Sequence, residues 1–141
     1  MSRRRGEAGF VSVWMLGLGV VVLFLGGLSL DLWRAYSVRR TVAQMVDTAA
    51  DAGASGIDEA GFRGPAQVVQ LDPLRAEALA RGALAADPAS ADLESAEVSA
   101  GTQRVTVRAS ALVPLTLMRL LLADLDLRVV VTGHAEPRGS T

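Results

Sequence analysis

The sequence has no cysteine, no lysine and only one histidine among its 141 residues. The absence of cysteine excludes disulfide bonds and thiol catalysis, although it does not identify a compartment. The lone His134 excludes a histidine-rich metal site. The 14 arginines nearly balance 15 acidic residues, so we expect no nucleic-acid partner. Arginine without lysine, beside abundant alanine, glycine, leucine and valine, suggests a GC-rich bacterial genome.

Patterns that indicate chemistry are also scarce. No serine stands in a recognisable motif with a histidine and an acid, and no phosphate-binding loop is present. Asp47 and Asp51 share one helical face, where two carboxylates mildly repel, so a solvated face is a simpler interpretation than a metal site. Arg104, Arg108 and Arg128 form either a basic patch for a polyanion or a soluble sheet face. We therefore predict no catalytic, cofactor-binding or metal-binding residues.

One long apolar run, residues 10–30, contains no charged side chain. As a helix it would be about 32 Å long, which matches the roughly 30 Å hydrocarbon core of a bilayer. A single segment crosses lipid only as a helix, because each backbone polar group needs an internal partner. A buried core helix would normally carry a polar face. We therefore interpret residues 10–30 as a single membrane span.

Residues 1–9 form a short leader with three clustered arginines, and three more arginines follow soon after the span. The arginine count alone is nearly balanced, but such a leader is typical of the cytoplasmic end of a signal anchor. We therefore expect the N-terminus inside and the remainder outside. A cleaved secretory signal fits less well, because the run is long and no small-x-small site follows.

The junction of Gly9 and Phe10 resembles a prepilin peptidase site. Type IV pilins usually carry a glutamate at the fifth mature position, which is Trp14 in this sequence. Cleavage after Gly9 and an uncut anchor both stay open.

Small residues also recur within the run. Ser12, Gly19, Gly26 and Trp33 are spaced seven residues apart and lie along nearly one helix face. Small side chains in this register let a neighbouring membrane helix approach closely. The alternative is that glycine is merely tolerated in a membrane helix.

Residues 31–54 predict a helix that continues the span into water. Trp33 and Tyr36 stand where aromatic side chains anchor at the membrane surface. We expect the helix to stop between Gly53 and Gly56, with glycine in the left-handed cap conformation. It packs either on the C-terminal part of its own chain or in a bundle with another subunit. Its predicted apolar stripe comprises Leu32, Ala35, Val42, Val46 and Ala49, widened by Tyr36, Ala43 and Ala50.

A distinctive pattern follows the charged leader and the uninterrupted span. It consists of Asp31, Arg34, Tyr36, Arg39 and Arg40, followed by the alanine-rich residues 49–54. This pattern resembles the N-terminal half of TadE/TadG-like proteins, which are pilin-like components of tight-adherence (Flp) pilus assembly systems. The resemblance implies a membrane-anchored assembly subunit that faces the cell exterior and has no enzymatic role. As partners we expect other pilus or secretion subunits, contacted through the N-terminal helix, and a second copy of the chain.

Residues 55–71 are rich in glycine and polar side chains, which predicts a linker of low order with at most a short edge segment at residues 68–71. Asp72 and Pro73 then make a favourable helix start, and the helix should run to about Ala86. We expect its apolar side to consist of Leu74, Leu79, Ala83 and Leu84.

Strand patterns follow within the small domain predicted over residues 72–141. Residues 96–100 and 104–111 alternate between apolar and polar side chains around a turn at Gly101-Thr102, and residues 127–132 predict a third strand. The apolar stretch 115–122 is too short to cross a membrane. It caps the core, dips into the bilayer surface or meets a partner.

The predicted fold class is α+β and pilin-like. A single N-terminal transmembrane helix continues into a long helix and then a small domain, in which one helix covers a mainly antiparallel three-stranded sheet. The leading functional hypothesis is a membrane-anchored, TadE/TadG-like structural or assembly subunit. It would reside in the bacterial cytoplasmic membrane, with possible incorporation into a surface appendage. The alternative is a membrane-tethered extracytoplasmic binding module.

Overall fold

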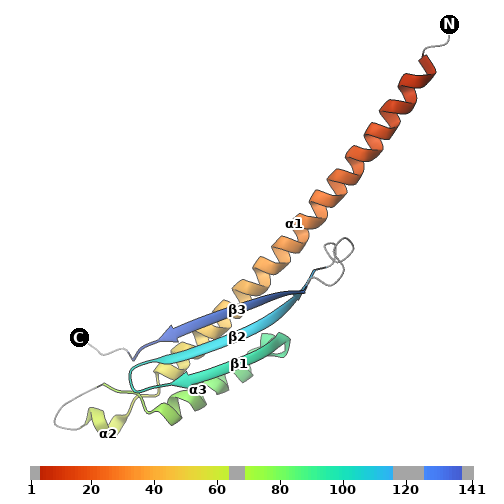
Figure 1. Cartoon of the computed structure of the whole chain (residues 1–141). Helices are drawn as coiled ribbons and strands as arrows, with labels where there is room; N and C mark the ends of the chain where they lie inside the picture. The colour runs from red at the N-terminus through yellow and green to blue at the C-terminus, as the bar shows by residue number, and fades with distance from the viewer. Residues whose placement is uncertain (1–3, 64–68, 116–125, 138–141) are drawn as a thin grey trace.

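The computed structural model describes residues 4–63, 69–115 and 126–137. A long helix, α1, extends far beyond a small domain that is built around its C-terminal half (Figure 1). The chain is therefore α+β, with a long apolar N-terminal helix, a second helix and a three-stranded antiparallel sheet, as predicted. The elements in order are α1 (Arg4–Ala54), α2 (Glu59–Phe62), α3 (Pro73–Ala86), the 3-10 helix η1 (Pro88–Asp92), β1 (Leu93–Ala100), β2 (Val105–Pro114) and β3 (Asp126–Ala135).

The sheet is an antiparallel meander in the order β1-β2-β3. The predicted turn between β1 and β2 is confirmed, and it is closed by a hydrogen bond of 2.8 Å from Gly101 N–H to the Arg104 carbonyl. Strand β1 begins earlier than predicted, at Leu93, with a register shift between Leu93 and Ser95. Pro114 is the last residue of β2, as expected of a residue that lacks a backbone donor.

The alternation along β2 separates a dry face from a wetter one. The predicted inward set, Val105, Val107, Ala109 and Ala111, is fully buried. On the other face Arg108 is exposed and Thr106 is half-buried. Ser110 departs from the pattern because it is buried, and its hydroxyl lies 2.8 Å from that of Ser95 on β1.

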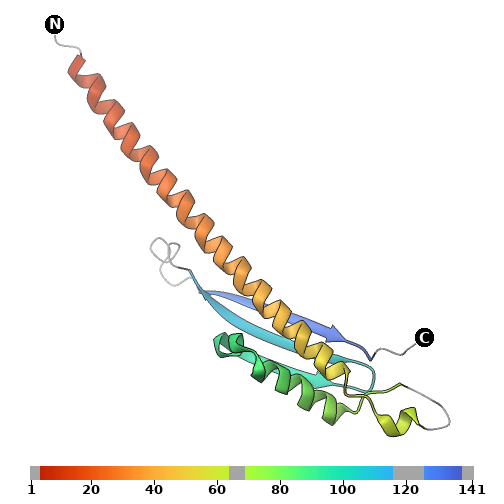
Figure 2. The same ribbon diagram turned by 180° about the vertical axis from the view of Figure 1, so that it is seen from behind.

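Two helices cover the inner face of the sheet, where the sequence predicted one. The C-terminal half of α1 contacts β2 and β3, and α3 lies beside it and contacts β1 (Figure 2). Residues 31–54 therefore pack on their own chain, which was one of the two arrangements left open. Bundling with another subunit stays a prediction.

The stripe that α1 presents to the domain is rotated from the predicted one. Val42, Val46, Ala49 and Ala50 are buried as expected, and Met45 is buried with them. Leu32 and Tyr36 are exposed, so their predicted place in the stripe is wrong. The true stripe rises through Val38, Ala35 and Asp31 at alternating steps of three and four residues.

Two glycines near the end of α1 allow the two helices to approach closely. A Cβ atom at Gly53 would lie 3.0 Å from the Ala76 carbonyl oxygen, and one at Gly56 would lie 2.9 Å from the Ala76 Cα and N atoms. Neither glycine has a positive φ angle, so the predicted left-handed cap is wrong. Close packing, and not backbone handedness, requires glycine at these positions.

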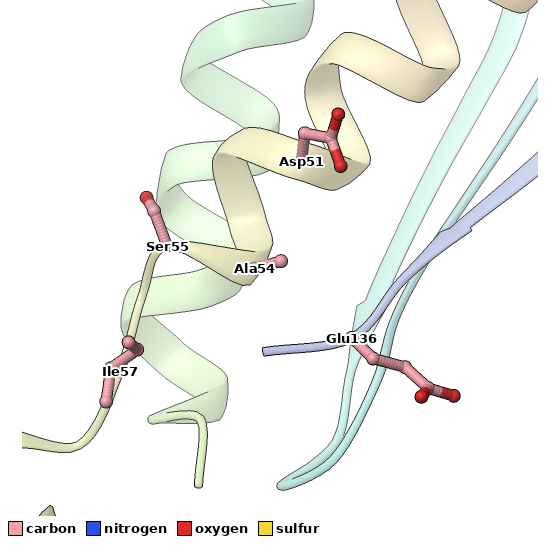
Figure 3. Close-up of a pocket in the computed structure, with 5 residues that line it drawn as sticks. All are labelled: Asp51, Ala54, Ser55, Ile57 and Glu136. Carbon is pink, nitrogen blue, oxygen red and sulfur yellow. The ribbon is translucent and has the colours of Figure 1, made fainter. Parts of the chain in front are cut away.

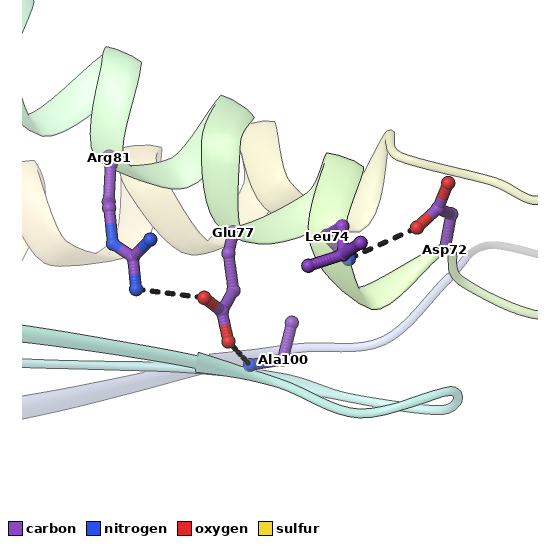
Figure 4. A network of polar contacts seen from close by, with 5 residues as sticks. All are labelled: Asp72, Leu74, Glu77, Arg81 and Ala100. Atoms are coloured by element: carbon purple, nitrogen blue, oxygen red, sulfur yellow. Dashed lines mark hydrogen bonds and ion pairs between the residues drawn. The ribbon is translucent and has the colours of Figure 1, made fainter.

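Helix α3 begins at Pro73, as predicted. The Asp72 carboxylate caps it by accepting a hydrogen bond from Leu74 N–H at 3.0 Å (Figure 4). It also accepts one from Arg75 N–H at 3.3 Å. Glu77 accepts from Arg81 Nη2 at 2.8 Å and from Ala100 N–H at 3.4 Å, which ties α3 to the end of β1.

The apolar side predicted for α3 is half right. Leu84 is buried and Ala83 packs half-buried against the core, as predicted. Leu74 is 82% exposed and Leu79 is also exposed, so their predicted places are wrong, and Ala76 and Ala80 are buried in their stead. Alanine occupies the contact because α3 packs against the glycines of α1, where a longer side chain does not fit.

The predicted linker, residues 55–71, has more order than expected. It contains the single turn of α2, and Ile57 pairs with Leu71 in an isolated antiparallel bridge. The predicted segment 115–122 lies outside the described residues apart from Leu115, which is buried. The edge segment predicted at residues 68–71 is described only from Val69 onward.

Candidate functional site

The N-terminal half of α1 is an apolar surface that its own chain leaves uncovered. Every residue from Gly9 to Gly26 is exposed, and only 6% of the most apolar 18-residue window is buried. A contiguous apolar surface of this size is not stable in water and marks a contact with lipid or protein. The helix is long and apolar enough to cross a membrane, and it is the one candidate span among the described residues. We therefore treat it as the candidate functional site.

One side of α1 faces the domain and the opposite side faces away from it. At about 100° per residue, Gly17, Ala35 and Gly53 face the same direction, because 18 residues complete about five turns. Gly53 packs against α3 and Ala35 is half-buried, so this direction is the domain side of the helix. Gly19 and Gly26 lie on roughly the opposite side. The predicted packing face therefore points away from the domain.

The predicted packing face is open along its length. No described atom lies within 4 Å of a Cβ built at Gly19 or at Gly26. Trp33 is 70% exposed at the C-terminal end of this face. Ser12 is exposed as well, and it makes an interaction within the chain. A neighbouring helix can approach this side without meeting the described part of the domain, although the pairing itself stays a prediction.

The domain side of the span carries a shallow apolar groove of about 340 Å³. It forms where Gly17 provides no side chain between larger neighbours. The residues that line it are Phe10, Val13, Trp14, Gly17, Leu18 and Val21.

The TadE/TadG-like positions fall on two sides of α1. Asp31 is only 3% exposed and has an interaction partner, on the domain side of the helix. Arg34, Tyr36, Arg39 and Arg40 are all exposed. No burial was predicted for Asp31, which stands directly after the apolar run. Its spacing of four residues from Ala35 was the available signal.

The possible processing site lies within a continuous helix. Gly9 and Phe10 are both exposed, and α1 runs through them from Arg4 without a break. The bond between them is therefore on an open surface of the helix. Whether it is cleaved stays a prediction.

A cavity of about 280 Å³ lies at the end of the domain far from the span, between the end of α1 and the end of β3 (Figure 3). Asp51 and Glu136 both line it, but the Glu136 carboxylate is turned away from Asp51 in Figure 3. Glu136 instead pairs with Arg104 at 2.7 Å. No group of three or more histidine, aspartate or glutamate side chains suited to a metal occurs within residues 4–63, 69–115 and 126–137.

The predicted basic patch is a face of mixed charge. Arg104 pairs with Glu136, and Arg128 pairs with Glu94. Arg108 stands directly across the β1–β2 ladder from Glu97. Exposed pairs of this kind contribute little to stability, and their balance favours the interpretation of this face as a soluble surface. His134 lies exposed on the same face, with its Nδ1 atom 3.4 Å from the Thr106 hydroxyl.

No protein-family model, curated protein or solved structure matches the chain. The function is therefore inferred from the arrangement of the long helix and the domain.

Proposed function

We propose that the chain is a membrane-anchored, pilin-like structural or assembly subunit of the TadE/TadG-like type, acting in a tight-adherence pilus or secretion system. The observation that carries the proposal is the division of α1 into two halves. Its first half is apolar and exposed, and its second half forms the core of a folded domain. One unbroken helix of 51 residues joins the two.

The membrane is the first partner in this proposal. Residues 10–30 cross the cytoplasmic membrane, with the arginine-rich leader inside and the domain outside. Trp33 and Tyr36, both exposed just after the span, anchor the helix at the outer surface. No catalytic step is required, because the work of such a subunit is to hold a domain at a fixed place.

Other subunits are the second partner. The open face that carries Gly19 and Gly26 receives a neighbouring helix, either from another pilus subunit or from a second copy. In lipid such contacts depend on close van der Waals packing, which small residues permit. The described part of the domain lies on the other side of α1, and none of its atoms lies within 4 Å of a Cβ at Gly19 or Gly26.

Cysteine crosslinking in native membranes tests the helix contact. The natural chain has no cysteine, so each introduced thiol reports one position. Gly19→Cys and Gly26→Cys should each crosslink to a neighbouring subunit. Gly17→Cys is the matched control, because it places a thiol on the opposite side of the same helix. Equal crosslinking from all three positions would indicate random collision in the membrane and would contradict the proposed face.

Deletion of the gene tests the biological assignment. We expect the deletion strain to lose surface pili or the associated secretion, and the wild-type gene to restore them. A strain with intact piliation and secretion would overturn the assignment to pilus assembly. If piliation is intact and the purified ectodomain is a monomer that binds a defined ligand, the alternative function, a membrane-tethered binding module, would be favoured.

A further inference from the structure

We infer that the end of the sheet at which β2 finishes and β3 begins lies in the headgroup layer of the bilayer and contacts lipid. The inference rests on the proposed span of residues 10–30 and adds a second contact with the same membrane. In this second contact, the lipid touches the surface of the domain as well as α1.

The position of this end along α1 follows from the packing of Gly133. A Cβ at Gly133 would lie 2.7 Å from Val46 Cγ1 and 2.9 Å from Asp47 Oδ1, so β3 meets α1 closely at this level. Leu127 lies six residues earlier on β3, or about 20 Å at ~3.3 Å per residue. The same distance along a helix is about 13 residues. Because β3 and α1 run in the same general direction (Figures 1 and 2), Leu127 is level with the turn that carries Trp33.

That level coincides with the membrane surface. The proposed span ends at Leu30, and the headgroup region extends roughly 5–7 Å beyond the hydrocarbon core. This thickness corresponds to about four helical residues past the span. Trp33 and the Leu127 end of the sheet therefore fall in the headgroup layer.

The burial along α1 independently supports this placement. Gly27 is buried although it lies inside the span segment, and Asp31, one turn later, is 3% exposed. Gly17, Gly19 and Gly26 are exposed in the same helix. Among the described residues, each turn of α1 from Gly27 to Val42 holds a buried or half-buried position on this side. The described part of α1 therefore has no fully exposed turn between the span and the domain that would hold the domain away from the bilayer.

The described side chains at this end suit a lipid surface. Leu112 is 46% exposed on the outer face of β2, and Leu127 is 41% exposed at the start of β3. Trp33 and Tyr36 stand at the same level on α1, and aromatic side chains of this kind favour the headgroup region. The acidic Asp31 at this level is withdrawn from the surface. Exposed apolar and aromatic groups therefore stand at this level, beside the exposed Arg34 and Arg128.

Quenching by brominated lipid tests the contact in the full-length chain. The protein is reconstituted in phosphatidylcholine–phosphatidylglycerol vesicles whose acyl chains carry bromine at either a shallow or a deep position. In a background with Trp14→Phe and Trp33→Phe, Leu127→Trp and Leu112→Trp each place one indole at the proposed contact. Gln103→Trp, in the β1–β2 turn at the far end of the sheet, is the control. Circular dichroism verifies that each variant is folded.

We expect shallow bromines to quench Leu127→Trp and Leu112→Trp about as strongly as the native Trp33, with little loss of fluorescence for Gln103→Trp. Trp14, retained alone, lies about 6 Å inside the proposed span, at ~1.5 Å per residue from Phe10, and should also be quenched by brominated acyl chains. If Trp14 is quenched but both leucine substitutions behave like Gln103→Trp, the inference is wrong and the membrane span stands. If Trp14 itself is not quenched, both the inference and the proposed span fail.

Discussion

Two glycines at the end of α1 decide how closely the helices of this domain can pack. At Gly56 a Cβ would meet two backbone atoms of Ala76 at 2.9 Å, and backbone atoms cannot move aside cheaply. At Gly82, in the exposed part of α3, no described atom lies within 4 Å of such a Cβ. The same glycine-to-alanine change therefore has opposite consequences at the two positions.

We predict that Gly56→Ala lowers the free energy of unfolding by about 1–3 kcal/mol, because the two helices must separate. Gly82→Ala should raise it by up to about 1 kcal/mol, because alanine has the higher helix propensity. Urea denaturation of both variants in detergent micelles measures the difference. Similar effects of the two changes would contradict the close crossing at Ala76.

The Asp72 side chain supplies a second residue-scale prediction. Its carboxylate satisfies two backbone donors at the start of α3. Asp72→Ala should therefore cost about 1 kcal/mol, whereas Asp72→Asn should be nearly neutral because asparagine caps equally well. Thermal unfolding of the three proteins provides the measurement. A loss of equal size in the asparagine variant would assign the effect to charge and not to the cap.

At the scale of elements, local signals predicted the start of α3 and the dry face of β2, whereas the packing of distant segments decided which side α1 buries. Asp72 and Pro73 fixed the start of α3, and the alternation from Val105 to Ala111 gave β2 its dry face. The rotation of the α1 stripe depends on where β3, about 90 residues later, crosses the helix at Gly133. No pattern within residues 31–54 contains that information.

For the candidate site as well, some features were predicted from the sequence and others depend on contacts between distant segments. Charge-free length was enough to predict the exposed apolar half of α1, because an apolar run long enough to span a bilayer is visible in composition alone. The burial of Asp31 and the alanine side of α3 were not predicted, because both depend on close contact with the rest of the fold. From the sequence alone, a glycine that is needed for close helix packing, as at Gly53, looks the same as a glycine that ends a helix in the left-handed conformation.

The stripe on α1 leads to an element-scale prediction. Met45 is buried in the core, whereas Leu32 is exposed, although the sequence placed Leu32 in the stripe. Met45→Ala should lower the free energy of unfolding by about 2–5 kcal/mol through lost apolar contacts and a cavity. Leu32→Ala should leave it nearly unchanged. Denaturation of the domain in micelles compares the two, and a larger loss from Leu32→Ala would restore the stripe that the sequence first suggested.

At the scale of the whole molecule, the two halves of α1 carry surfaces suited to two different solvents. Its first half presents apolar side chains outward, as a helix in lipid does, and its second half buries them against a sheet, as a helix in water does. One unbroken helix joins the two halves. The proposed function requires residues 10–30 to lie in lipid with the domain outside.

Labelling of single cysteines in spheroplasts tests this claim most directly, since the natural chain has no cysteine to interfere. Thr102→Cys places a thiol on the exposed β1–β2 turn, and Val20→Cys places one at the centre of the apolar segment. We predict that a membrane-impermeant maleimide labels Thr102→Cys in intact spheroplasts and labels Val20→Cys only after detergent is added. Labelling of Thr102→Cys only after lysis would reverse the orientation, and labelling of Val20→Cys without detergent would contradict the membrane span itself.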